Sequence, residues 1–217
     1  MITNNLFKHA QKELVMDAFL CWLANEADSN ERWIDIKEEF LSLIGLENNK
    51  ISTIQDIEAR TQVDYMDLLI ELKTPRGMEE IVFENKMWST VHSKQLERYK
   101  EKKPDAAQYV YLKLGYLHRL DKQAARNAGY LIISAEQLFE TLKPFKERHP
   151  FIREFADYLK ADFVQPQKQF KQDLEDNNYE KFAKASFQQY VMDEIMDRLL
   201  GNGFEESNLI FRITVVR

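Results

Sequence analysis

The amino-acid sequence predicts an α/β protein: a mixed sheet flanked by helices, with a helical C-terminal appendage. The order of hydrophobic periodicities is helix, three strands, helix, two strands and then helices, which is typical of such a core. A composition of 44% hydrophobic and 30% charged residues is that of a folded globular chain, not a disordered one. We expect the core to occupy residues 1–145 and the appendage residues 146–217.

The first half of the chain should contain two helices and three strands. Helical spacing of apolar residues predicts helices over 6–26 and 33–45, the second closed by Gly45. A strand is expected over 51–60. Residues 65–72 and 79–86 are the strongest strand candidates, because Thr74-Pro75-Arg76-Gly77 between them has Pro and Gly at positions that turns favour.

The second half should add a helix over 90–103, stopped by Pro104, and strands over 107–114 and 129–134. Ser134 can cap a helix that runs to about Leu142. Further helices are expected over 150–160 and 179–200. The run 210–217 resembles an unfinished strand, so a truncated sequence is one open interpretation.

Several classes of protein are excluded by composition and motifs. No apolar run reaches the roughly 20 residues that cross a bilayer. The one cysteine, Cys21, allows no internal disulfide, which fits a reducing cytoplasm. The four histidines are not spaced as a zinc cluster, and neither a Walker-type loop nor a nucleophile elbow is present. We therefore expect a cytoplasmic protein without a membrane partner.

Charge is distributed unevenly along the chain. Residues 86–126 hold ten Lys/Arg and four Asp/Glu, a net of +6, so the rest of a chain with net charge −6 carries −12. A basic segment beside an acidic site suits a phosphate-binding groove. A solvated helix face would have the same composition, and charge alone does not decide between them.

The hairpin between the two best strands gathers charged residues. With Pro75-Arg76 as a two-residue turn, Asp67 faces Glu84 across the strands, and Lys86 projects from the same side. Five apolar residues then lie on the opposite side, which should face the core: Leu68, Ile70, Leu72, Ile81 and Phe83. A three-residue loop with Gly77 in a bulge would instead slip the register by one, and the apolar alternation favours the first register.

Two carboxylates as close as Asp67 and Glu84 would be in this register repel each other unless a cation lies between them. A hard divalent ion such as Mg²⁺ prefers oxygen ligands and can polarise a phosphate and activate a water molecule. Lys86 could orient that water or stabilise charge on phosphorus. The three residues Asp67, Glu84 and Lys86 therefore suit phosphodiester hydrolysis.

An acid-x-Lys triplet alone is a weak signal, because the chain has four of them. Only Glu84-Asn85-Lys86 ends an apolar strand with an acid suitably placed on the preceding strand. A second feature lies downstream, where Gln95 and Tyr99 share one helix face. That face could point to a phosphate, or it could be partly buried against the sheet.

These motifs together resemble the PD-(D/E)XK nuclease superfamily, and most closely its RecB-like branch with a Q-x-x-x-Y helix. The residues that carry the resemblance are the segments 67–70, 81–86 and 95–99, with 12–20 similar to the first helix of a bacterial group. The position before Asp67 is Met66 where the superfamily motif has proline.

The resemblance implies a restriction-endonuclease-like fold and a metal-dependent DNA nuclease. Asp67, Glu84 and the backbone carbonyl of Asn85 would bind Mg²⁺, for which Mn²⁺ could substitute. Lys86 would be catalytic, assisted by Gln95, Tyr99 and Glu13. Glu13 and Asp17 could equally form a surface pair, since they lie one helical turn apart.

Two other functions fit the same residues. One is a catalytically silent module of the same fold that binds nucleic acid or protein in a defence or repair system. The other is an enzyme that acts on RNA or nucleotides. The intact set of Asp67, Glu84 and Lys86 favours the DNA nuclease over the silent module.

Overall fold

A computed structural model describes residues 5–9, 12–29, 31–91, 94–178, 180–181 and 184–203. Their core is a five-stranded sheet in the order β1-β2-β3-β4-β5. The strands are β1 (Asp56–Val63), β2 (Met66–Thr74), β3 (Gly77–Lys86), β4 (Gln108–Lys113) and β5 (Leu131–Ser134). The first three are antiparallel, whereas β3, β4 and β5 run parallel, so the predicted mixed sheet is confirmed.

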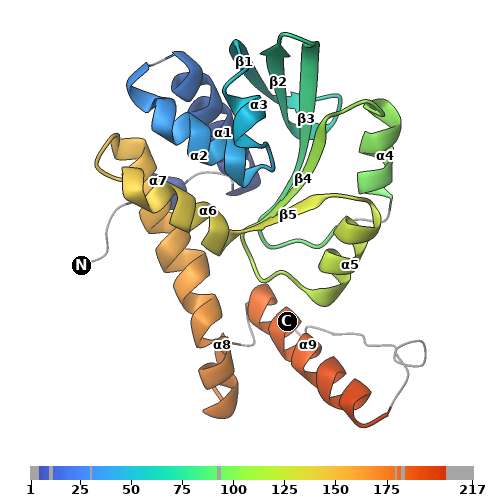
Figure 1. The fold of residues 1–217 in the computed structure, drawn as a ribbon. Helices are drawn as coiled ribbons and strands as arrows, with labels where there is room; N and C mark the ends of the chain where they lie inside the picture. Colours follow the sequence, from blue (N-terminus) through green and yellow to red (C-terminus); the bar gives the residue numbers. More distant parts are fainter. Residues whose placement is uncertain are drawn as a thin grey trace.

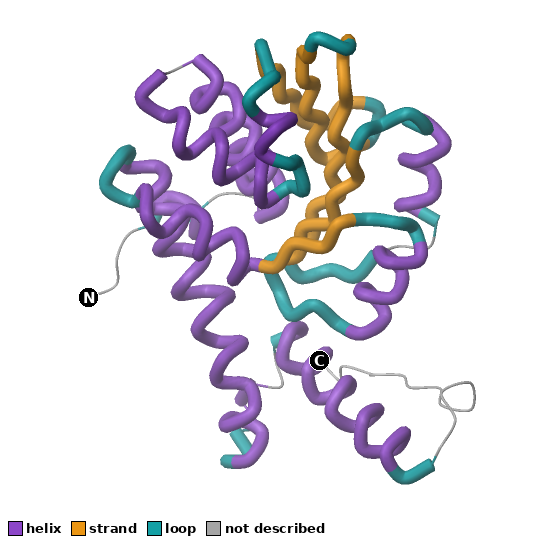
Figure 2. Tube along the Cα trace, in the orientation of Figure 1, coloured by secondary structure: helices purple, strands orange, loops and turns teal. Residues whose placement is uncertain are grey.

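Helices cover both faces of the sheet (Figures 1 and 2). One face carries the larger hydrophobic core, into which α1 (Lys12–Ser29), α2 (Ile34–Leu43), α6 (Ala135–Leu142) and α7 (Pro150–Leu159) pack. The other face has a smaller core, covered by α4 (Gln95–Lys102) and α5 (Arg119–Asn127). The smaller core leaves room for charged groups on the second face.

The described residues after β5 lie mostly in helices, as expected. Ser134 caps α6 through a capping box with Gln137, as its sequence position predicts. After α7, one π-helical turn, η4 (Lys160–Val164), leads into α8 (Gln165–Glu175), and α9 (Ala185–Gly201) follows. The division at residue 145 stays a prediction, but Ile152 and Phe155 beyond it share the main core with the sheet.

Several predicted boundaries were wrong, because short helices or 3₁₀ turns occupy the neighbouring residues. Residues 48–51 form the short helix α3 (Asn48–Ile51), so β1 begins at Asp56 and not near residue 51. The N-terminal helix begins at Lys12, preceded by the 3₁₀ turn η1 (Leu6–Lys8). Short 3₁₀ turns also precede α2 (η2, Glu31–Trp33) and follow α6 (η3, Lys143–Phe145).

The helix expected over 90–103 is shorter, because Lys94 has a left-handed backbone with φ of 65° and α4 starts only after it. The helix expected over 179–200 is α9, which begins at Ala185. Helices α5 and α8 were not predicted, because both are rich in charged and polar residues. The run 210–217 lies outside the described residues.

Candidate active site

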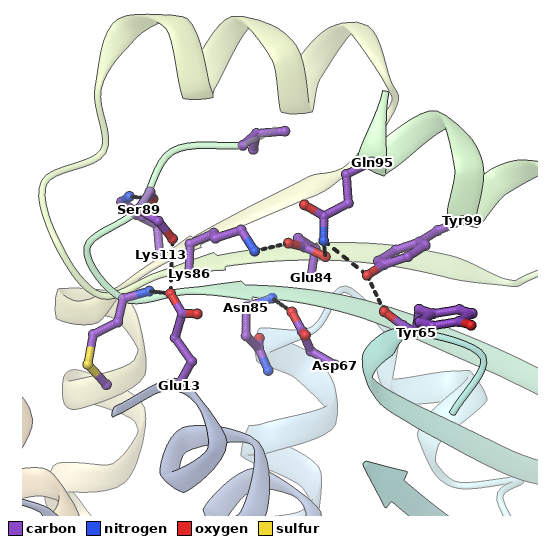
Figure 3. A network of polar contacts seen from close by, with 12 residues as sticks. Glu13, Tyr65, Asp67, Glu84, Asn85, Lys86, Ser89, Gln95, Tyr99 and Lys113 are labelled. Atoms are coloured by element: carbon purple, nitrogen blue, oxygen red, sulfur yellow. Dashed lines mark hydrogen bonds and ion pairs between the residues drawn. The ribbon is translucent and has the colours of Figure 1, made fainter. Parts of the chain in front are cut away.

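The β2–β3 hairpin has the register that the alternation favoured. Thr74 pairs with Gly77 around a two-residue turn, and Leu68 pairs with Phe83. The paired residues end there, and continuation of this register would place Asp67 opposite Glu84, with Lys86 two residues later on the same face. The three-residue loop is therefore excluded. Figure 3 shows these side chains at the C-terminal end of β3.

Glu84 is the most enclosed group of the site, with none of its surface exposed. One carboxylate oxygen, Oε1, forms an ion pair with the Lys86 ammonium, and the other, Oε2, accepts a hydrogen bond of 2.9 Å from Gln95 Nε2. Burial, and then the negative charge of Asp67, raise the pKa of Glu84 to about 7. Glu84 can therefore exchange a proton near neutral pH.

Lys86 is paired with this carboxylate, and Asp67 lies beside it on the neighbouring strand. Asp67 Oδ2 accepts a hydrogen bond of 2.8 Å from the backbone N–H of Asn85, and burial raises the pKa of Asp67. Burial tends to lower the pKa of Lys86, but Glu84 outweighs it and the pKa is raised. Lys86 is only 6% exposed and stays charged, so the site keeps a buried cation between its acids.

Helix α4 brings Gln95 and Tyr99 to the same place. Gln95 Nε2 also contacts the Tyr99 hydroxyl at 3.1 Å, and that hydroxyl donates to the backbone carbonyl of Tyr65 (Figure 3). Tyr99 is at the same time buried in the smaller core beside Leu96. The helix face is therefore packed against the sheet, as the second interpretation had it, and it also reaches the Glu84 carboxylate. Contact with a phosphate stays a prediction.

Helix α1 contributes two acids from the opposite side of β3. Glu13 Oε1 accepts hydrogen bonds from Met87 N at 3.2 Å and from the Ser89 hydroxyl at 3.0 Å. Asp17 is buried and accepts a hydrogen bond of 2.8 Å from the Asn85 side chain. These contacts are incompatible with a solvated surface pair.

Asp17 was not identified as a site residue from the sequence, although its helical spacing from Glu13 was the signal for it. Burial, and then the charges of Asp67 and Glu13, raise the pKa of Asp17 to about 7. The hydrogen bond from Asn85 lowers this pKa but does not cancel the rise. Two carboxyl groups with such a pKa, Asp17 and Glu84, thus lie on the two sides of β3. Strongly perturbed pKa values of this kind are concentrated at functional sites.

A second buried ion pair lies beside the site and was also missed. Lys113 has no exposed surface, lies 3.5 Å from Asp121, and donates to the Ser89 carbonyl. Asp121 in turn accepts a hydrogen bond of 3.1 Å from Val91 N. The pair therefore fastens the segment that joins β3 to α4. The signal for this pair in the sequence was that Lys113 ends a strand. In the sheet that strand end lies next to Lys86.

The donor chemistry suits a hard divalent cation. Asp67 and Glu84 are close enough for the charge of Asp67 to raise the pKa of Glu84, a repulsion that a cation between them would relieve. In the described part of the chain, no three Asp, Glu, His or Cys side chains gather as a metal-holding group. Two carboxylates would nevertheless be compatible with Mg²⁺, which commonly completes its shell with water and phosphate oxygens.

Carboxylates and a lysine thus lie together at the end of a hairpin, on a mixed sheet between helices (Figure 3). The chain belongs to the PD-(D/E)XK nuclease superfamily, since a family model of that superfamily matches residues 1–172. The resemblance seen in the sequence is thereby confirmed at the level of the superfamily. Assignment to the RecB-like branch stays a prediction.

Comparison with solved structures finds similarity to the DNA modification-dependent restriction endonuclease AspBHI. The identity is 16% and the TM-score 0.35, over 70% of this chain and 41% of that one. The chain thus spans less than half the length of that enzyme. Comparison with curated proteins gives no match. No helix in the described residues is both long and apolar enough to span a membrane.

Proposed function

We propose that this protein is a metal-dependent nuclease that hydrolyses DNA phosphodiester bonds. The observation that carries the proposal is the position of Glu84, which lies near Asp67 at the end of the hairpin and contacts Lys86 and Gln95. Membership of the superfamily supports the nuclease class. The net charge of +6 over residues 86–126 supports an anionic polymer as the substrate.

Asp67, Glu84 and the carbonyl oxygen of Asn85 are the proposed ligands of Mg²⁺, with Mn²⁺ able to substitute. When bound, such an ion would polarise the phosphate and lower the pKa of a water molecule. The donor set supports this choice of metal, because it consists of oxygen atoms without sulfur or imidazole.

The protein's own groups would prepare the site. Lys86 places a cation where negative charge grows on the phosphate, and it can orient the attacking water. Gln95 holds the Glu84 carboxylate in one orientation, and Tyr99 holds Gln95. Glu13 is proposed to complete the acidic set from α1 while it fixes the segment after β3 through Met87 and Ser89.

The test is cleavage of linear, circular and single-stranded DNA in the presence of Mg²⁺, by the unaltered protein and by Lys86→Ala. We expect the substitution to reduce turnover by about 100-fold or more, since single charge-stabilising groups in active sites contribute that much. Circular dichroism should show an intact fold, because Glu84, with a pKa of about 7, can take up a proton when its partner is lost.

Lys73→Ala is the matched control, because Lys73 ends the triplet Glu71-Leu72-Lys73 on the neighbouring strand, is exposed, and lies toward the other end of the hairpin. It should cleave at the unaltered rate. Unchanged turnover in Lys86→Ala would refute the role of Lys86. Metal-independent DNA binding without cleavage would favour the silent module, and cleavage of RNA alone would favour the RNA enzyme.

A further inference from the structure

The turn between β1 and β2 contains a tyrosine, Tyr65, that the backbone of the turn does not favour. Val63 pairs with Met66, so Asp64 and Tyr65 form a two-residue turn, and both have positive φ, 51° and 70°. This is the pattern of a type I′ hairpin turn, which prefers Asn and Gly because side chains are strained there. A tyrosine at its second position is an unfavourable choice for the backbone.

Packing does not explain the choice either. Tyr65 is 84% exposed, the largest fraction among the large hydrophobic side chains that the structure describes. Its one ring contact given by the structure is with Lys102, whose Nζ lies 4.6 Å from the ring centre. Most of the ring therefore faces solvent. Strained residues that are not needed for packing are concentrated at functional sites.

The turn is held firmly in place beside the candidate active site. The Tyr65 carbonyl accepts from the Tyr99 hydroxyl, and the Asp64 carbonyl accepts a hydrogen bond of 2.8 Å from Lys102. On the other side, Gln62 donates to Asp17 at 3.2 Å. These bonds involve the backbone of the turn or the side chain of Gln62, so they fix the turn without any need for an aromatic ring at residue 65.

Hydrogen bonds connect the turn to the catalytic carboxylate. From the Tyr65 carbonyl the connection runs through Tyr99 and Gln95 to Glu84 (Figure 3). The backbone that carries the exposed ring is therefore fixed beside the proposed site of cleavage. An aromatic face with a lysine beside it is the combination by which proteins bind single-stranded nucleic acid, through base stacking and phosphate contact.

We propose that Tyr65 is a stacking position for an unpaired nucleobase of the substrate, with Lys102 binding the adjoining phosphate. This inference rests on the proposed function and deepens it, since it specifies that part of the substrate beside the site is single-stranded or unstacked. Such stacking tolerates any base, because every base has a π-face.

The experiment measures binding of a single-stranded oligonucleotide that contains the fluorescent base 2-aminopurine, with Ca²⁺ in place of Mg²⁺. Unaltered protein and Tyr65→Phe should quench the fluorescence and bind equally well. Tyr65→Gly should lose the quenching and bind about 5- to 150-fold more weakly, the range for loss of one stacked base. Its melting temperature should not fall, because glycine relieves the positive φ.

Asp64→Gly is the matched control, because it relieves the same turn and keeps the ring; it should quench as strongly as the unaltered protein. Equal binding and quenching by Tyr65→Gly and unaltered protein, or no binding of the oligonucleotide at all, would overturn the inference. The proposed function is judged separately by the cleavage assay with Lys86→Ala. If that assay succeeds while Tyr65→Gly behaves as the unaltered protein, only the stacking role fails.

Discussion

The two faces of the sheet differ most sharply at the end of β3, where neighbouring residues enter opposite environments. Phe83 lies in the larger core beside Leu68, and Glu84, one residue later, is equally inaccessible on the other face. The first face is stabilised by removal of apolar surface from water. The second keeps acids and lysines out of water, which costs free energy even when they are paired.

That difference shows which face serves stability and which serves chemistry. Replacement of a buried ion pair by apolar residues is often neutral or stabilising, so Glu84 with Lys86, and Lys113 with Asp121, are a poor choice for stability alone. Together these pairs fasten the strand end, the following segment and helix α5. Their arrangement is understandable if the protein must hold charges in fixed positions for a reaction.

The largest expected difference is in stability, between a substitution of Phe83 and a substitution of its neighbour Glu84. Phe83→Ala should destabilise the protein by about 3–5 kcal/mol, because it leaves a cavity in the main core. Glu84→Gln, without metal, should be at least as stable as the unaltered protein, because it removes a buried charge that faces Asp67. Urea unfolding in EDTA measures both.

Added Mg²⁺ or Mn²⁺ should raise the melting temperature of the unaltered protein, and Glu84→Gln and Asp67→Asn should remove that rise, because a ligand stabilises only the state that binds it. A large loss of stability in metal-free Glu84→Gln would show that the second face is structural too, and the contrast between the faces would fail.

A smaller effect should appear in the pH dependence of stability. The folded protein keeps the Glu84 proton up to a pKa of about 7, whereas the ordinary pKa of a glutamate side chain is 4.5. Between these values the folded state binds more protons than the unfolded state, so metal-free stability should fall as pH rises from about 4.5 to 7 and then level off. The drop attributable to Glu84 should be on the order of 3 kcal/mol at most.

Urea unfolding at several pH values in EDTA tests this dependence. Asp17 has a similarly raised pKa and should add to the same fall. Glu84→Gln should flatten the profile in part, while Glu97→Gln, a change of the same charge at an exposed position of α4, should leave it unaltered. A stability that rises with pH over this window would contradict the raised pKa of Glu84.

The smallest expected effect is that of Gln95→Ala. Loss of its hydrogen bond to Glu84 should reduce cleavage by about 10-fold while stability falls by about 1 kcal/mol. The acidic limb of the pH–rate profile should move to higher pH, because Gln95 stabilises the ionised carboxylate. Gln172→Ala on α8 serves as the control, and a loss of stability without any change in the profile would show a packing role alone.

Elements with strong local signals were predictable. The turn at Pro75 and the alternation on either side of it decide the hairpin register, so the facing of Asp67 and Glu84, with Lys86 beyond, follows from the sequence. The cap at Ser134 and the strands β4 and β5 also rest on neighbouring residues. Periodicity and turn chemistry act over a few residues, which is why sequence alone determined them.

Tertiary structure decided what surrounds that hairpin. The burial of Asp17 and the pairing of Lys113 with Asp121 depend on contacts between segments far apart in the chain, and so does the hydrogen bond of Tyr99 to the turn at Tyr65. A carboxylate or a lysine has the same local preferences whether it is solvated or buried. Its pKa and its role are set by desolvation and by the charges of neighbours, and those are established only when the helices pack onto the sheet.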